Sequence, residues 1–111
     1  MSASQPWQMF PFFNDVAPEW GHKLWCFLTE PDSVAQMMRA SDAGRPAVEG
    51  IAVRLHERLG DAVAENRVKQ FTGLLVRRIM EENGYRFISH NHTCRENPVF
   101  STGSLYERKR T

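Results

Sequence analysis

Residues 48–59, VEGIAVRLHERL, decide the fold because they carry the most regular apolar pattern in the chain. Apolar side chains recur there at i, i+3, i+4, i+7 and i+11, which is the stripe of an amphipathic α-helix. The members of this stripe are Val48, Ile51, Ala52, Leu55 and Leu59. Gly60 follows the stripe as a C-cap residue. We therefore expect a helix that buries one face.

A longer helix is predicted next, from about residue 65 to residue 83. Its apolar residues cover a wide arc, so we expect it to be the central helix. Its interior Thr72-Gly73 pair would permit close approach by another element. Asn83 and Gly84 end it, with Gly84 in the left-handed conformation and Tyr85 packed back onto the helix. The apolar residues are Val68, Phe71, Leu74, Leu75, Val76, Ile79 and Met80.

Another helix is predicted to begin in residues 29–33, TEPDS. Pro31 suits the first helical turn, and either Thr29 or Asp32 can serve as the N-cap. This helix would end near Ser41 and carry three apolar residues, Val34, Met37 and Met38.

The remaining apolar runs predict β-strands. Residues 22–29, HKLWCFLT, are apolar on both faces, as in a covered strand. Residues 85–94 and 98–106 predict a hairpin whose turn is residues 95–98. All three strands are expected in one small antiparallel sheet with three helices packed on one face, an α+β fold.

Residues 1–20 are rich in proline and aromatic residues and predict an extended aromatic arm, whereas residues 21–111 predict a single domain. Large aromatic side chains in such an arm need to be covered, either by the domain or by a second subunit. We therefore expect a homodimer. The interface candidates are Trp7, Phe10, Phe12, Phe13 and Trp20.

The composition of the chain limits its expected partners and its expected location in the cell. The 111 residues include 14 basic and 13 acidic residues, so the net charge of +1 gives no general attraction to nucleic acid. Cys26 and Cys94 match no disulfide framework, which favours a reduced, cytoplasmic protein. The N-terminus lacks the basic and apolar regions of a secretory signal, and the longest apolar stretch is too short for a membrane span.

His90, His92 and Cys94 have the spacing most suggestive of a metal site. On a strand their side chains would share one face, and imidazole and thiolate are zinc ligands. His22 or Cys26 is a possible fourth ligand. The paired spacings of zinc sites are missing, so we predict no tightly bound metal and no cofactor. No nucleophile elbow, P-loop, HExxH or dinucleotide fingerprint is present, so no catalytic residue is assigned.

Arg77, Arg78 and Arg86, together with residues 108–110, could form a phosphate-binding surface. The order helix, turn, helix and hairpin is also that of a winged helix. Glu81 and Glu82, the nearly neutral net charge and the central position expected for the long helix argue against DNA binding.

The stretch RRIMEENGYRF, followed by PVFSTGSLY, resembles small uncharacterised bacterial proteins, some of them carried as integron gene cassettes or other mobile-element orphans. The resemblance covers residues 67–106 at most and implies no particular activity. Its residues are Arg77, Ile79, Met80, Glu81, Gly84, Tyr85, Phe100, Ser101, Ser104 and Tyr106.

Three functions remain open. The first is a non-enzymatic binding or adaptor protein, homodimeric and of mobile-element type. The second is a winged-helix-like DNA-binding protein. The third is a small-ligand binder or enzyme that uses an apolar pocket between helices and sheet, to which Met37 and Met38 would contribute.

Overall fold

A computed structural model of the chain describes residues 18–60, 66–94 and 100–110. Within these ranges, four α-helices precede a two-stranded antiparallel sheet, so the predicted α+β class is confirmed. The helices are α1 (Pro18–Leu28), α2 (Pro31–Asp42), α3 (Ala47–Leu59) and α4 (Asn66–Glu82), and the strands are β1 (Tyr85–Thr93) and β2 (Thr102–Arg108).

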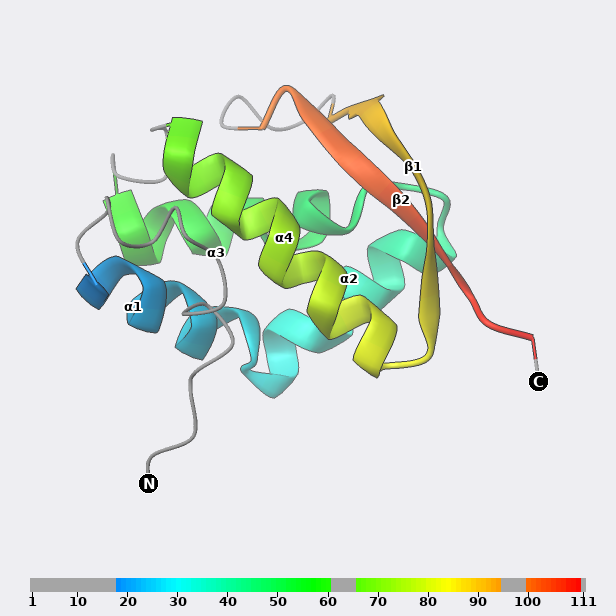
Figure 1. Cartoon of the computed structure of the whole chain (residues 1–111), viewed down its shortest axis with the longest axis horizontal. Helices are drawn as coiled ribbons and strands as arrows, with labels where there is room; N and C mark the ends of the chain where they lie inside the picture. The colour runs from blue at the N-terminus through cyan, green and yellow to red at the C-terminus, as the bar shows by residue number, and fades with distance from the viewer. Residues whose placement is uncertain (1–17, 61–65, 95–99, 111) are drawn as a thin grey trace.

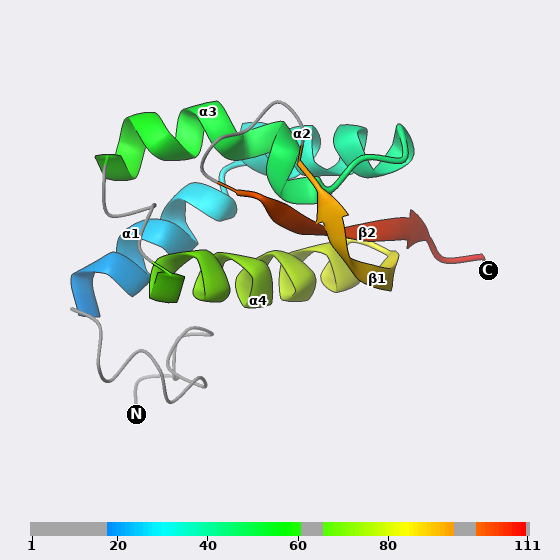
Figure 2. The same ribbon diagram turned by 90° about the horizontal axis from the view of Figure 1, so that it is seen from above.

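The hairpin of β1 and β2 lies across the helices, as Figures 1 and 2 show from two directions. Strand β1 packs chiefly on α4, while β2 packs on α2 and α3. Seen from above, α4 runs on one side of the hairpin and the α2–α3 pair on the other (Figure 2). The side chains that fill the space between them form one core.

The prediction of a strand over residues 22–29 is wrong, because this segment belongs to helix α1. Leu24, Phe27 and Leu28 are buried, and their i, i+3, i+4 spacing is that of one helical face, whereas Cys26 is exposed. A short apolar run fits a strand and a buried helix equally well by composition. The described part of the sheet therefore has two strands, and the helices number four.

Helix α2 begins with Pro31 in its first turn, as predicted, but neither proposed cap residue acts as one. Glu30 occupies the N-cap position without a side-chain hydrogen bond. The hydroxyl of Thr29 instead donates to the carbonyl of Trp25, 2.8 Å away, at the end of α1. Met37 is fully buried, and the helix continues to Asp42, one residue beyond the predicted end.

The helices predicted over residues 48–59 and 65–83 are confirmed as α3 and α4. Every member of the α3 stripe is buried, and so are the five α4 residues Phe71, Leu75, Val76, Ile79 and Met80. Gly84 adopts the predicted left-handed conformation, with φ of 85°. Helix α3 approaches α2 closely at Gly50, where a Cβ atom would lie 2.4 Å from the carbonyl oxygen of Gln36.

The predicted hairpin is also confirmed, although β2 covers residues 102–108 rather than 98–106. Phe87 pairs with Tyr106, and beyond this pair the register shifts twice, on either side of Ser89. Asn91 has a φ of 70°, a conformation that asparagine tolerates better than most residues. The turn predicted at residues 95–98 and most of the predicted arm lie outside the described residues.

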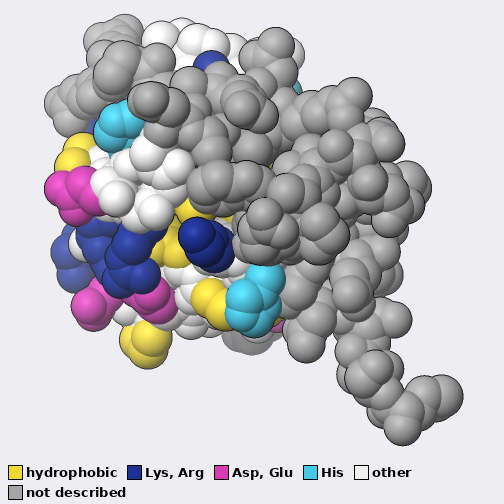
Figure 3. Space-filling model, turned by 90° about the vertical axis from the view of Figure 1, so that its left-hand side faces the viewer, with side chains coloured by type: hydrophobic (Ala, Val, Ile, Leu, Met, Phe, Trp, Pro, Cys, Tyr) yellow, Lys and Arg dark blue, Asp and Glu magenta, His cyan; other side chains and the backbone are white. Residues whose placement is uncertain are grey.

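Basic and acidic side chains are interspersed on the face that lies at the left of Figure 1, as Figure 3 shows. One ion-pair cluster joins the α1–α2 turn to α3, with Glu30 lying 3.1 Å from Arg54 and 2.9 Å from Arg58. Both guanidinium groups also lie over the ring of Phe27. Among the described residues, no helix is long and apolar enough to cross a membrane.

Candidate functional site

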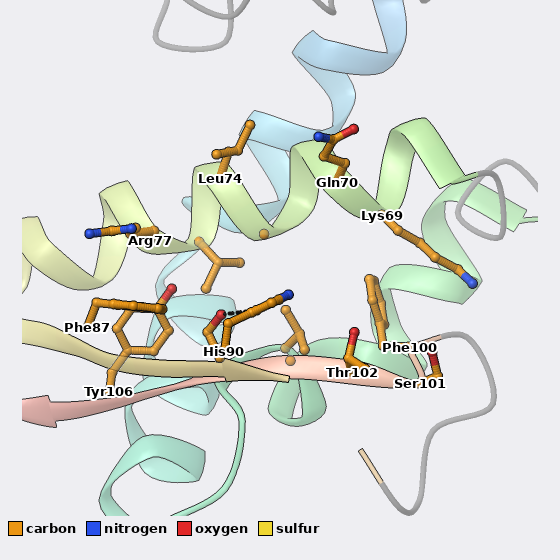
Figure 4. Close-up of a pocket in the computed structure, with 15 residues that line it drawn as sticks. Lys69, Gln70, Leu74, Arg77, Phe87, His90, Phe100, Ser101, Thr102 and Tyr106 are labelled. Carbon is orange, nitrogen blue, oxygen red and sulfur yellow. Dashed lines mark hydrogen bonds between the residues drawn. The ribbon is translucent and has the colours of Figure 1, made fainter. Parts of the chain in front are cut away.

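A groove of about 450 Å³ lies between α4 and the hairpin, and Figure 4 shows the side chains around it. The lining combines apolar and aromatic side chains with polar and basic ones. The lining residues on which the following paragraphs depend are Lys69, Gly73, Phe87, His90, Phe100 and Tyr106.

Helix α4 forms one wall with side chains spaced so that they share a face. Lys69, Gly73 and Arg77 are four residues apart in turn and therefore lie above one another along the helix. A Cβ atom at Gly73 would have no heavy atom within 4 Å, so this glycine leaves space in the groove. The close approach of another element that the Thr72-Gly73 pair suggested does not occur at Gly73.

The hairpin forms the opposite wall, and paired aromatic rings close one end of it. The rings of Phe87 and Tyr106 meet edge to face, with centroids 6.0 Å apart. The guanidinium of Arg77 lies 4.3 Å from the centroid of the Phe87 ring, which joins this wall to α4. Such cation–π and aromatic contacts are favourable and fix the position of the rings.

A hydrogen bond joins the two strands on the groove side. Nδ1 of His90 lies 2.8 Å from the hydroxyl of Ser104. Burial raises the pKa of Tyr106 to about 12, so its phenol stays protonated at neutral pH. The remaining ring nitrogen of His90 projects into the groove (Figure 4). This nitrogen is therefore placed to hydrogen-bond a ligand.

The charged side chains among the described lining residues are all cationic. They are Lys69 and Arg77, and no aspartate or glutamate is among the described residues that line the groove. Arg77 has its own carboxylate partner in Glu81, 2.9 Å away and outside the lining. Lys69 is half-buried and makes no ion pair with the described residues.

The three candidate metal ligands, His90, His92 and Cys94, do not come together. His90 lines the groove, whereas His92 lines a separate hollow beside Arg45 and Glu49, and its Nε2 is hydrogen-bonded to Ser89. The register shifts in β1 break the strict alternation on which the prediction relied. The residues of the described ranges contain no group of three potential ligands.

Cys94 is buried, and burial raises the pKa of its thiol to about 11, with Glu49 adding to the effect. The thiol is therefore protonated at neutral pH and is a poor metal ligand. The possible fourth ligands, His22 and Cys26, lie next to each other on α1, with Nε2 and Sγ 3.6 Å apart.

Three arginines of the predicted phosphate-binding surface, Arg77, Arg78 and Arg86, are each paired with a carboxylate of the same chain. Arg77 pairs with Glu81 at 2.9 Å and Arg78 with Glu82 at 3.2 Å, while Arg86 pairs across the hairpin with Glu107. These pairs neutralise the positive charge that would attract a phosphate backbone.

Of the predicted interface residues, Trp7, Phe10, Phe12 and Phe13 lie outside the described residues. Trp20 falls within α1, which begins inside the segment predicted as an arm, but its side chain is not among those described.

Sequence reasoning did not single out the groove. Phe87, Phe100 and Tyr106 were assigned to strands, and Lys69 was not noticed at all. The only available signal was Gly73, a helix-weakening residue in the middle of a long apolar helix. Comparison of the chain with family models, with curated proteins and with solved structures finds no match. What the groove can bind therefore follows from its own residues.

Proposed function

We propose that the chain is a non-enzymatic binding protein whose groove between α4 and the hairpin holds a small, partly apolar molecule. The observation that carries this proposal is the groove itself. Its volume of about 450 Å³ lies within the range of small-molecule sites, roughly 300–1,000 Å³. Such sites combine apolar and aromatic walls with a few polar groups that orient the ligand.

The polar groups favour binding over catalysis. Ser104 and His90 are hydrogen-bonded to each other, as a nucleophile and its base are in hydrolases. In those enzymes a carboxylate orients the histidine, and none of the described residues that line this groove is a carboxylate. The hydrogen bond between Ser104 and His90 joins the two strands. The Ser104 hydroxyl therefore holds the hairpin together.

Titration with N-phenylnaphthylamine, an uncharged aromatic dye whose fluorescence rises in apolar surroundings, tests the proposal. We expect saturable binding of one dye per chain. Gly73→Leu should abolish binding, because its side chain would fill the space that the glycine leaves. Leucine also favours the helix more than glycine does, so this variant should remain folded.

Ala35→Leu is the matched control, because Ala35 is an exposed position of α2 outside the groove. This variant should bind the dye like the original chain. Equal dye binding by both leucine variants would show that the dye lies elsewhere, and absence of binding to the original chain would refute the proposal.

A further inference from the structure

The groove has one end at which several donors face an apolar wall. Figure 4 shows Lys69 extending from α4 beyond Phe100, with Thr102 on the hairpin below, whereas the projecting nitrogen of His90 lies further along the groove. Lysine carries three N–H donors and no acceptor, and the threonine hydroxyl can also donate. A ligand group placed here would therefore meet donors from both walls.

The charge of Lys69 sets it apart from the arginines described above. Arg45, Arg54, Arg77 and Arg108 are each within 3.1 Å of a carboxylate of the same chain. Lys69 has no such partner among the described residues, although it is half-buried in the groove wall. Partial burial of an ammonium group removes hydrating water, and a counter-charge offsets that cost. The described lining residues supply none, because no acidic side chain is among them.

We infer that the groove selects a small organic acid, with Lys69 binding the acidic group and the aromatic walls holding an apolar body. This inference rests on the function proposed above and adds the class of ligand. Thr102 would donate a hydrogen bond to the same acidic group, and Phe87 and Phe100 would contact the apolar part. Hydrogen bonds between charged partners are the stronger kind, so the acidic group should contribute strongly to affinity.

Two dyes that differ only in charge test this inference. Anilinonaphthalene sulfonate has the same fused rings and anilino group as N-phenylnaphthylamine but carries a sulfonate. We expect the sulfonate dye to bind the chain about tenfold more tightly at low salt, which corresponds to about 1.4 kcal/mol. Added salt should weaken binding of the sulfonate dye and leave that of the neutral dye unchanged.

Substitutions of Lys69, with a substitution of Lys109 as the control, show whether Lys69 causes the preference for the sulfonate dye. Lys69→Met keeps an unbranched apolar stem and should lower affinity for the sulfonate dye about tenfold, with no change for the neutral dye. Lys69→Arg retains the positive charge and should retain the preference. Lys109→Met removes an exposed charge that follows β2, outside the groove, and should change neither affinity.

The possible outcomes distinguish the failure of this inference from the failure of the proposal that the groove binds a small molecule. Binding of the neutral dye with no preference for the sulfonate dye would overturn the anionic class and leave the small-molecule groove intact. Equal sulfonate binding by the Lys69→Met and Lys109→Met variants would do the same. Sulfonate binding that persists in Gly73→Leu would place that dye outside the groove and also overturn the inference. Failure of both dyes to bind the original chain would remove the proposed function as well.

Discussion

The hydroxyl of Tyr85, the first residue of β1, donates a 2.8 Å hydrogen bond to the carboxylate of Asp42, the last residue of α2. Arg108, the last residue of β2, donates two further hydrogen bonds to the same carboxylate, at 3.0 and 2.8 Å. Because Tyr85 and Arg108 are partners in the sheet register, Asp42 holds the two strands at the same point. The hairpin is thereby fixed to the helices beneath its open end.

Stability should depend on the ionisation of Asp42. The hydrogen bond from Arg108, followed by that from Tyr85, holds the pKa of this carboxyl below its ordinary value of 3.8. A lowered pKa in the folded state stabilises the fold above the unfolded-state pKa, and this stabilisation is lost as the pH falls through the folded-state value. Urea denaturation between about pH 5 and pH 2 should therefore show a falling free energy of unfolding, with a shallower fall in Asp42→Asn. Equal slopes would contradict the assignment.

Tyr85→Phe removes the hydroxyl and keeps the buried ring. We expect a loss of about 1.5–3 kcal/mol in the free energy of unfolding, the range for a hydrogen bond to a charged group. In the Asp42→Asn background the same change should cost less, because the two residues interact directly. Additive effects in this double-mutant cycle, measured by urea denaturation, would show that the hydroxyl stabilises the fold in some other way.

Leu55→Ala should destabilise the core strongly. Leu55 is fully buried in the α3 stripe, and truncation of such a leucine typically costs about 2–5 kcal/mol. Val53 lies on the same helix but is 72% exposed, so Val53→Ala should change the free energy of unfolding by less than about 0.5 kcal/mol. Thermal and urea denaturation of the two variants provide the comparison, and an unchanged midpoint for Leu55→Ala would refute the core assignment.

The two cysteines should differ in reactivity. The Cys94 thiol is buried and has a pKa of about 11, whereas Cys26 is exposed. Because the thiolate is the reactive form, iodoacetamide at neutral pH should modify Cys26 much faster than Cys94 in the native protein. Peptide mass spectrometry at successive times measures both rates. Unfolding in urea should remove the difference, and fast native modification of Cys94 would contradict its burial.

Self-association through the aromatic N-terminal segment stays a prediction. Several large aromatic residues within residues 1–17 would gain from being covered by a second copy, and two-fold dimers are the commonest closed assemblies. Sedimentation equilibrium should give a dimer mass for the full chain and a monomer mass after deletion of residues 1–17, which leaves α1 intact. A monomer mass for the full chain at high micromolar concentration would refute the prediction.

The sequence predicted those elements whose local signals agree with one another. For α3 and α4, the spacing of the apolar residues and the glycine after each helix indicated the same boundaries. The structure contains both helices close to those boundaries. Residues 22–29 carried no such agreement. Their dense apolar run hid the helical spacing of Leu24, Phe27 and Leu28, because Trp25 and Cys26 filled the gaps with further apolar side chains.

The groove could not be predicted in the same way, since it depends on tertiary placement. It includes the open space at Gly73, and its lining takes in His90 but not His92, which lines a separate hollow beyond the register shifts of β1. Neither feature produces a periodic pattern of residues that could be recognised in the sequence. The shared face that the strand pattern suggested for His90, His92 and Cys94 fails for the same reason, because alternation along a strand holds only where its pairing is regular.

Asp42 and Arg108 are 66 residues apart, and this separation sets an order of events during synthesis. Helices α1 to α4 and strand β1 are synthesised before β2, so the groove has only one wall until the hairpin forms. Val76, which is buried in the finished protein and lines the groove, lacks that second wall until then. The helices would thus expose apolar surface until the hairpin docks and the clamp at Asp42 closes, and slow docking would prolong the interval in which chaperones, or other chains, can bind them.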